Sequence, residues 1–566
     1  MTGHVPLRSL SSVLTLTLVA RRKLVKVKHS LVLVPSLPVD SSAWLSSPCP
    51  WILALGASLL LPPTPSTTTK PNPGPPHQAF LGIASHSPHA GGGKKALLGA
   101  LCLASPCCSP SRCCCCKVQT TMAASWRGPV VAVLCAVVVL HAVAAAATSC
   151  AGVAPAKHRP EAISITDFGG VGDGRTLNTW AFRKAVYRIQ HQRRRGGTTL
   201  HVPAGTWLTG SFNLTSHMTL FLARGAVLKA TQDTRRWPLM EPLPSYGRGR
   251  ELPGARYASF IHGNGLRDVA ITGDKGVIDG QGEVWWNMWR RRTLEHTRPN
   301  LVEFMHSTGI HISNIVLKNS PFWNIHPVYC DNVVVTNMMI LAPHDSPNTD
   351  GIDPDSSSNV CIEDSYISTG DDLVAIKSGW DEYGIAYGRP SSGITIRRLR
   401  GSSPFSGIAI GSEASGGVRD VLVEDCSIFD SGYGIHIKTN VGRGGYIRNV
   451  TVDNVRMSGV RISGVRIAGD VGDHPDAHFS QLAVPLVDAV RISNVWGVNV
   501  QHPGSLEGIR SSPFTRICLS NVKLFGWRKN DAAWRCRDVR GAALGVQPSP
   551  CAELATSFAS AGSSCS

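Results

Sequence analysis

Two groups of carboxylates near the middle of the sequence have the residue types that acid–base catalysis requires. The first is Asn348-Thr349-Asp350-Gly351-Ile352-Asp353 and the second is Gly370-Asp371-Asp372. Asp350 and Asp371 are 21 residues apart, slightly less than one coil of a solenoid whose neighbouring strands lie about 4.8 Å apart. We therefore expect Asp350, Asp371 and Asp372 to meet on one face. Adjacent carboxylates raise one another's pKa, so one can stay protonated while another is ionised. Cleavage of a glycosidic bond needs that division into an acid and a base.

Further polar residues fall on the same predicted face. Strand alternation in residues 434–438 (Gly-Ile-His-Ile-Lys) buries the two isoleucines and turns the histidine and the lysine outward. The same parity points Ile352 and Ile376 inward and their following residues outward. The outward set is Asp353, Lys377, His436 and Lys438, and Ser406 lies on the intermediate coil, before Ile408. Carboxylates beside cations would suit an acidic sugar.

Each of these residues also has an ordinary structural interpretation. Asp and Asn are common turn residues, and a lone histidine such as His436 is more often a surface residue than a catalytic one. Clustered acids can bind calcium, but no EF-hand-like spacing occurs, and no Cys-x-x-Cys or His/Cys spacing indicates zinc. Taken singly, each group of residues favours the ordinary interpretation. The groups taken together, in this order along the chain, favour a catalytic site instead. We expect no metal and no cofactor.

Short strands that recur at a regular interval must position these residues. One series begins at Val333, Val360, Ile394, Val421 and Val450, with starts 27, 34, 27 and 29 residues apart. Asn332, Asn359 and Asn449 precede their strands, as a repeated turn residue would. A second series interleaves at residues 375–376, 408–410 and 435–437. Strands this short bury an apolar face only by stacking, which indicates a solenoid.

The sequence thus predicts an all-β fold, a parallel β-helix spanning residues 160–555. Residues Leu177 to Gln190 place Trp180, Phe182, Val186 and Ile189 at roughly helical spacing, and a short amphipathic helix there would cap the open N-terminal end of the core. A β-sandwich is the alternative, but it would favour antiparallel hairpin turns that are not found.

At this point the sequence resembles the polygalacturonase family of glycoside hydrolases, and its plant members most. The family pattern is Asn-Thr-Asp, Gly/Gln-Asp-Asp, Gly/Ser-His-Gly and Arg-Ile-Lys, of which the first two are intact at 348–350 and 370–372. The resemblance runs from about Ile163 to Cys551. It also covers the segments 278–282, 285–286, 320–323, 326–327 and 406–413. It implies a right-handed parallel β-helix and a pectin-degrading enzyme.

The resemblance also implies roles for individual residues. Asp371 would be the general acid, and Asp350 and Asp372 would activate water. Lys438, with His436, would hold the substrate carboxylate, and Asn348, Asp353, Lys377 and Ser406 would line the binding site. The family inverts configuration, which predicts acid and base oxygens about 6.5–9.5 Å apart. Two positions depart from the pattern: Ser406 stands where the family commonly has histidine, and His436 where it commonly has arginine.

The expected function is hydrolysis of α-1,4-galacturonosyl bonds in pectin. The departures leave open a hydrolase of rhamnogalacturonan or xylogalacturonan, or a non-catalytic cell-wall protein that binds pectin. A calcium-dependent lyase on the same fold would need a basic proton abstractor rather than three acids. Residues Gly379 to Ser392 lengthen one coil; they are expected to form a loop at one end of the groove that closes it for exo attack, or a plain surface insertion.

Charge and the N-terminal sequence bear on location. The chain carries +18, but residues 1–147 hold 12 Lys/Arg and one acid, which leaves +7 for the remainder. Mild basicity suits a polyanion without choosing one; the motifs favour pectic polysaccharide over nucleic acid. Residues 1–121 are interpreted as a low-complexity leader or a gene-model extension, and 122–147 as a signal peptide. We expect a secreted, extracellular monomer of the cell wall, with membrane attachment only if residues 129–147 stay uncleaved.

The cysteines divide in the same way, since nine of the 17 lie at or before Cys135. Eight remain in the folded part, an even number that permits disulfides. The predicted pairs are Cys330 with Cys361, and Cys536 with Cys551 or Cys565.

Overall fold

The structure is a computed structural model that describes residues 15–20, 23–28, 158–192, 194–526 and 534–555. The chain divides into two compact units, Met1–Gln119 and Thr120–Ser566. In the first unit, β1 (Thr15–Ala20) and β2 (Lys23–Lys28) pair in antiparallel fashion, a hairpin not predicted from the sequence. The predicted signal segment at 122–147 lies outside the described residues. Among the helices that are described, none is both long and apolar enough to cross a bilayer.

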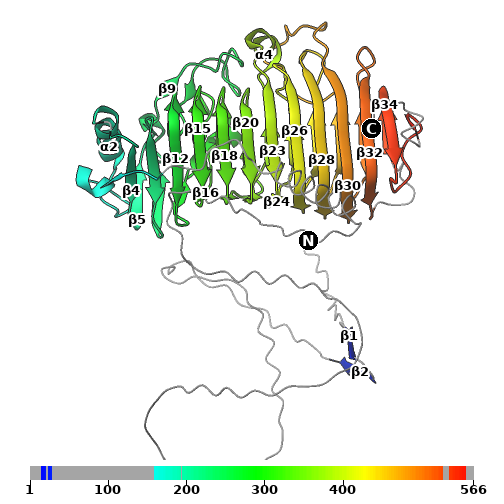
Figure 1. Cartoon of the computed structure of the whole chain (residues 1–566), viewed down its shortest axis with the longest axis horizontal. Helices are drawn as coiled ribbons and strands as arrows, with labels where there is room; N and C mark the ends of the chain where they lie inside the picture. Colours follow the sequence, from blue (N-terminus) through cyan, green and yellow to red (C-terminus); the bar gives the residue numbers. More distant parts are fainter. Residues whose placement is uncertain (1–14, 21–22, 29–157, 193, 527–533, 556–566) are drawn as a thin grey trace, which may run out of the picture. The chain divides into compact units, whose positions relative to one another are not determined.

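The second unit is a right-handed parallel β-helix, as predicted. Its strands lie side by side in chain order along one axis (Figure 1). The first face consists of fourteen strands paired in parallel, each to the next: β3 (Glu161–Ser164), β4 (Thr198–Val202), β7 (Met218–Leu222), β12 (Arg267–Gly273), β15 (Thr308–Ser313), β18 (Asp331–Thr336), β20 (Ser358–Glu363), β23 (Ser391–Arg397), β26 (Val418–Phe429), β28 (Tyr446–Ser458), β30 (Leu486–Val498), β32 (Phe514–Leu524), β34 (Val539–Leu544) and β35 (Leu554–Ala555).

A second face adjoins the first and merges with it where the strands become long. Its strands are β5 (Gly205–Thr209), β8 (Ala226–Ala230), β13 (Val277–Asp279), β16 (Val316–Lys318), β19 (Met339–Leu341), β21 (Tyr366–Ser368) and β24 (Arg400–Ser402). β24 pairs with the C-terminal half of β26. From β26 to β32, single long strands therefore serve both faces.

The third face carries the predicted chemistry. Its strands are β6 (Phe212–Asn213), β11 (Ile261–Asn264), β14 (Val302–Met305), β17 (Ile325–Val328), β22 (Val374–Ile376), β25 (Ser406–Ile410), β27 (Tyr433–Lys438), β29 (Ser463–Ala468), β31 (Gly504–Glu507) and β33 (Trp534–Arg537). On this face, the coil that lies between β17 and β22 has no strand and makes only isolated bridges, at Ile352 and Asp355.

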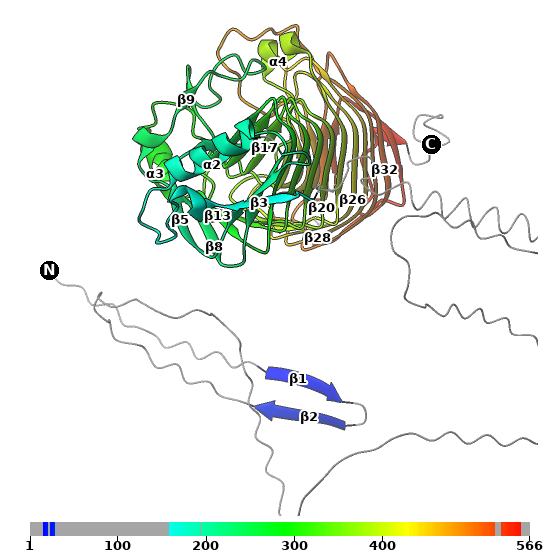
Figure 2. The ribbon, with the colours of Figure 1, turned by 60° about the vertical axis from the view of Figure 1, so that its left-hand side comes forward.

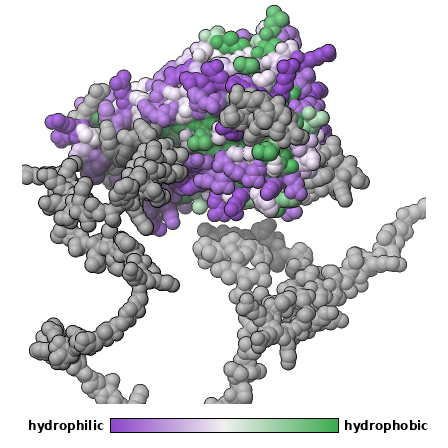
Figure 3. Space-filling model, turned by 45° about the vertical axis from the view of Figure 1, so that its right-hand side comes forward, coloured by the Kyte–Doolittle hydropathy of each residue, from purple (hydrophilic) through white to green (hydrophobic). Residues whose placement is uncertain are grey.

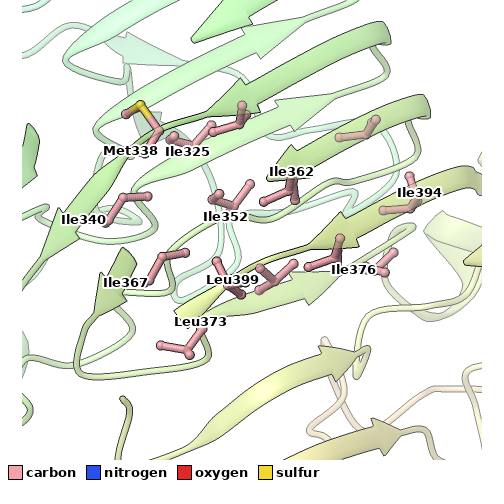
Figure 4. Close-up of a cluster of buried hydrophobic side chains, with 14 of the residues drawn as sticks. Ile325, Met338, Ile340, Ile352, Ile362, Ile367, Leu373, Ile376, Ile394 and Leu399 are labelled. Atoms are coloured by element: carbon pink, nitrogen blue, oxygen red, sulfur yellow. The ribbon is translucent and has the colours of Figure 1, made fainter. Parts of the chain in front are cut away.

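Stacked aliphatic side chains inside the coil form the core. Both predicted series are confirmed, because Val333, Val360, Ile394, Val421 and Val450 are register partners on successive strands and β22, β25 and β27 align in the same way. Figure 4 shows isoleucines and leucines from several coils, Ile352 and Ile376 among them, gathered into one cluster. Each fully buried side chain of this kind contributes roughly 1.5–3 kcal/mol.

The turn asparagines adopt the left-handed conformation that such a turn demands. Asn332, Asn359 and Asn449 have φ of 59°, 52° and 53°, and asparagine tolerates this region better than other residues with a Cβ. The Asn359 amide donates to Oδ1 of Asn332 on the preceding coil at 2.6 Å. Gly393, with φ of 63°, takes the next equivalent position. Turn and strand therefore repeat together.

A helix covers the N-terminal end of the coil. α2 (Thr179–His191) matches the predicted capping helix within two residues, and Figure 2 shows it lying across that end. Phe182 of α2 stacks on Phe212 of β6, with ring centroids 4.7 Å apart. Trp180 was assigned to the same apolar stripe but is 66% exposed, because one residue in a helix turns about 100° from the next and Trp180 precedes Phe182 by two.

The remaining elements lie outside the main sheets. They are the antiparallel pair β9 (Leu239–Met240) and β10 (Arg256–Tyr257), the 3-10 helices η1 (Ile165–Phe168) and η2 (Thr234–Arg236), and the helices α3 (Glu283–Arg290) and α4 (Asp381–Tyr387). The face drawn in Figure 3 is mostly hydrophilic, with apolar residues in smaller patches. Most apolar side chains are thus buried inside the coil.

One predicted disulfide is confirmed and the other is wrong. Cys536 and Cys551 are bonded. Cys330 is a free, buried cysteine, and its side chain belongs to the apolar core. Cys361 lies on β20 between Val360 and Ile362, which both point into the core, so strand alternation turns Cys361 the other way.

Candidate active site

The register of the third face places the catalytic candidates in one column. Ile352 bridges Val374, and Val374 pairs with Ile408. Asp350, Asp372 and Ser406 each precede one of these by two residues, so they occupy the same position on three successive coils. Asp371 adjoins Asp372. Each of the three aspartates has one carboxylate oxygen in a group whose members all lie within 4.8 Å of one another. The predicted meeting of the three side chains on one face is therefore confirmed.

The expected wide separation of acid and base is wrong. The predicted range was about 6.5–9.5 Å, whereas oxygens of all three carboxylates meet within 4.8 Å. The acid Asp371 adjoins Asp372 in the sequence, and Asp350 stacks on Asp372 in the adjacent coil, because neighbouring strands stand about 4.8 Å apart.

The three carboxylates are electrostatically unequal. Burial, with the charges of Asp350 and Asp372, raises the pKa of Asp371 well above its ordinary value. Burial also raises the pKa of Asp350, against the opposing effect of Lys377. Burial alone would raise the pKa of Asp372 too, but Lys438 outweighs it and the net pKa is lowered. One site therefore holds a carboxyl that tends to keep its proton and a carboxylate that tends to lose it.

Direct contacts account for the anionic state of Asp372. Nζ of Lys438 lies 2.5 Å from Oδ2 of Asp372, and the backbone N–H of Ser406 donates to Oδ1 at 2.8 Å. Asp371 has weaker support: Nδ2 of Asn348 is 3.4 Å from its Oδ2, and Arg298 donates to Oδ1 of Asn348 at 2.8 Å. Asn348 is thus oriented from behind, as a positioning residue would be.

Beneath the aspartates lies a buried cluster centred on Lys377. Its Nζ is 3.7 Å from Asp350, 3.5 Å from Asp353 and 3.3 Å from Glu413, and it stands 4.5 Å above the ring centroid of Trp323. Asp353 and Lys377 do point away from the core, as the parity predicted. Both are nevertheless buried, because the aspartates and aromatic residues of neighbouring coils cover them.

His436 is in contact with Ser406 but is not a cation. Its Nδ1 lies 3.2 Å from Oγ of Ser406, and its ring packs 4.2 Å from that of Tyr433. Burial, together with the neighbouring charge of Lys438, lowers the pKa of His436 to about 3. The imidazole is therefore neutral near neutral pH.

An open groove of about 560 Å³ runs over the site. All predicted site residues line it except Asp353, which lies below. The residues that line it are Arg250, Glu251, Trp289, Phe322, Trp323, Asn348, Asp350, Asp371, Asp372, Lys377, Phe405, Ser406, Ser412, Glu413, Tyr433, His436, Lys438, Arg466, Val471 and Asp473.

Comparison with known proteins decides the family. Residues 199–549 match the family described as "Glycosyl hydrolases family 28". The chain belongs to this family. A "Probable polygalacturonase" of Vitis vinifera is 51% identical over 398 residues, which cover 70% of this chain and 81% of that protein. The crystal structure of a "hyperthermoactive Exopolygalacturonase from Thermotoga maritima" has a TM-score of 0.60 at 27% identity and covers 70% of this chain and 93% of that one. A polygalacturonase from Erwinia carotovora, at TM-score 0.56 and 24% identity, shows the same fold.

Two residues that line the groove of this family 28 glycoside hydrolase, Glu413 and Arg250, were not predicted from the sequence. Glu413 lies in the segment 406–413 that carries the resemblance but has no predicted role, and its carboxylate accepts hydrogen bonds from Lys377 and Arg250. Arg250 comes from the segment after β9 and also pairs with Asp473 at 3.0 Å. No local pattern marks Arg250 or its partners Glu413 and Asp473, because these contacts join segments more than 160 residues apart.

The segment Gly379–Ser392 was expected to be a loop. In the structure it contains the helix α4. None of its described residues lines the groove. Instead it supports the groove wall from behind: Trp380 stacks under Arg250 at 4.4 Å and donates to the carbonyl of Asp473 at 3.0 Å. Asp381 is buried in an ion pair with Arg443.

The aspartate trio is close enough to hold a cation. The ammonium groups of Lys438 and Lys377 already balance its charge, at 2.5 Å from Asp372 and 3.7 Å from Asp350. A divalent ion would have to compete with both lysines, so the donor set fits a metal poorly. The site fits acid–base chemistry on the family's glycosidic substrates better.

Proposed function

We propose that this enzyme hydrolyses α-1,4-galacturonosyl bonds of pectin, with Asp371 as general acid and Asp372 as general base. The observation that carries the proposal is the opposite shift of two adjacent carboxyl groups: the pKa of Asp371 is raised by burial and that of Asp372 is lowered by Lys438. Glycosidic hydrolysis needs one protonated and one ionised carboxyl at the scissile bond. The names of the relatives in grape and Thermotoga support the pectic substrate.

The close spacing of the carboxylates suits a shared nucleophilic water. A water that donates one hydrogen bond of about 2.7 Å to each of two carboxylates spans roughly 4–5.4 Å between their oxygens, and Asp350 and Asp372 have oxygens within 4.8 Å. Asp372 would take the proton and Asp350 would hold the water in line. Attack by water on the face opposite the leaving group gives inversion.

The cations in and beneath the groove support an acidic substrate. Lys438 faces the groove while holding Asp372, and Lys377 lies below the aspartates. Asn348, Ser406 and His436 contribute polar groups to the lining, and Asp353 lies beneath it beside Lys377. We further propose secretion to the cell wall as a monomer. Two segments, Asn213-Leu214-Thr215 and Asn449-Val450-Thr451, match the N-glycosylation sequon, and both asparagines are exposed, as glycosylation would require.

A substrate panel tests the proposal. Purified enzyme is incubated with polygalacturonate, rhamnogalacturonan and xylogalacturonan. Reducing ends are measured together with ultraviolet absorbance, which marks unsaturated products. We expect reducing ends from polygalacturonate without ultraviolet absorbance, and an inverted anomer in early NMR spectra. Release from one of the other polymers alone would reassign the substrate. Absence of release from all three, with binding retained, would support a non-catalytic pectin-binding protein, and unsaturated products would indicate a lyase.

A further inference from the structure

Most cations of the groove are already engaged by carboxylates of the protein. Arg250 lies 2.6 Å from Glu413 and 3.0 Å from Asp473. Lys377 is surrounded by three carboxylates and Lys438 is 2.5 Å from Asp372. A substrate carboxylate that approached any of them would have to displace an existing partner.

Arg466 differs from these cations. It lies on β29 and lines the groove, and its one carboxylate neighbour among the described residues is Asp470 at 3.6 Å, whose side chain is 55% exposed. An exposed pair of this kind contributes little. The Nε atom of Arg466 is buried and has no hydrogen-bond partner. A buried donor without a partner is unfavourable, and the side chain as a whole is 25% exposed where it lines the groove.

The register fixes where this guanidinium stands. Arg466 pairs with His436 on the preceding coil, and Nη1 donates to Oη of Tyr433 at 3.2 Å. Tyr433 occupies the column of Asp372 and Ser406, because Ser406 and Tyr433 are register partners. The guanidinium is therefore held by a tyrosine two coils from Asp372, a distance of roughly 10 Å along the groove.

We propose that Arg466 also binds the substrate, by holding the carboxylate of a uronic acid unit that lies along the groove from the cleaved bond. This rests on the proposed function. A guanidinium binds a carboxylate through two parallel N–H donors, which an ammonium cannot do. Arg466 is accordingly a specificity-determining residue for acidic over esterified substrate.

The test replaces Arg466 and measures KM and kcat separately on polygalacturonate and on its methyl ester. In Arg466→Gln we expect KM for polygalacturonate to rise about 10- to 100-fold, the loss of one charge-assisted contact, with kcat changed less than about threefold. The preference for free acid over ester should fall by a similar factor. Arg466→Lys should lie between the two. Arg461→Gln, an exposed arginine on the same coil, is the matched control and should match wild type.

A binding arm separates this inference from the proposed function. Affinity for trigalacturonate is measured by calorimetry in Asp371→Asn and in Asp371→Asn/Arg466→Gln, without need of turnover. Weaker binding in the double variant supports the role of Arg466 even if the natural substrate is another uronic acid polymer. Equal affinity in the two variants, or an unchanged KM in a folded Arg466→Gln enzyme, overturns it.

Discussion

Replacement of Lys377 by methionine should destabilise the fold severely at neutral pH. Lys377 lies within 3.3–3.7 Å of Glu413, Asp353 and Asp350, and all four side chains are buried. Methionine keeps the apolar length of the side chain but leaves the carboxylates without their shared cation. Removal of one partner of a buried ion pair costs about 3–5 kcal/mol, a large part of the about 5–15 kcal/mol that stabilises a protein.

The deficit should depend on pH in a defined direction. Without Lys377, the folded-state pKa values of Asp353 and Asp350, already raised by burial, rise further. A group whose folded pKa is raised stabilises the fold below its unfolded pKa, and that contribution is lost as pH increases. The difference between Lys377→Met and wild type should therefore be largest near neutral pH and shrink toward about pH 4, near the unfolded values of Asp and Glu.

Urea unfolding, followed by circular dichroism at both pH values, measures this difference. Lys318→Met is the matched control, because Lys318 is exposed at the end of β16 and should change stability by less than about 0.5 kcal/mol. Addition of Asp353→Asn to Lys377→Met removes one uncompensated charge and should restore part of the loss. A loss below about 1 kcal/mol at neutral pH, or one that is equal at both pH values, would refute the charge-balance argument.

Two further predictions concern pH dependence and the disulfide. The profile of kcat/KM should be bell-shaped: activity falls on the alkaline side as Asp371, with its raised pKa, loses its proton, and on the acid side as Asp372, with its lowered pKa, gains one. His436→Gln should leave both limbs in place since His436 is already neutral; a limb that vanishes would show that the histidine titrates. Cys536→Ser/Cys551→Ser opens a link between residues 15 apart and should cost about 3 kcal/mol; an unchanged melting temperature would contradict a structural role for this bond.

The repeating parts of the fold could be predicted from local sequence. Asn332 and Asn359 mark turns because few other residues accept a positive φ, and the alternation around Ile352 and Ile376 correctly gives the faces of their neighbours. These signals depend only on nearest neighbours in the chain, so a single sequence contains them.

Other features depend on contacts that no local pattern encodes. The parity of Lys377 was right, but its burial follows from Trp323 and Glu413 on other coils. Arg250 reaches the groove from a connecting segment and pairs with residues far along the chain. The short distance between carboxylates follows from the stacking of Asp350 on Asp372, which requires the exact coil register that the spacing of 21 residues left open.

The most direct test of the unequal roles of the aspartates is the rate at which Asp371→Asn releases reducing ends from polygalacturonate. Asp364→Asn, an exposed carboxylate next to β20, is the control. Loss of a general acid typically costs 10²- to 10⁴-fold, so we expect a fall in kcat of about that size in Asp371→Asn with a folded protein and near-normal trigalacturonate binding, and a control rate equal to wild type. An Asp371→Asn enzyme within about tenfold of wild type would contradict the account.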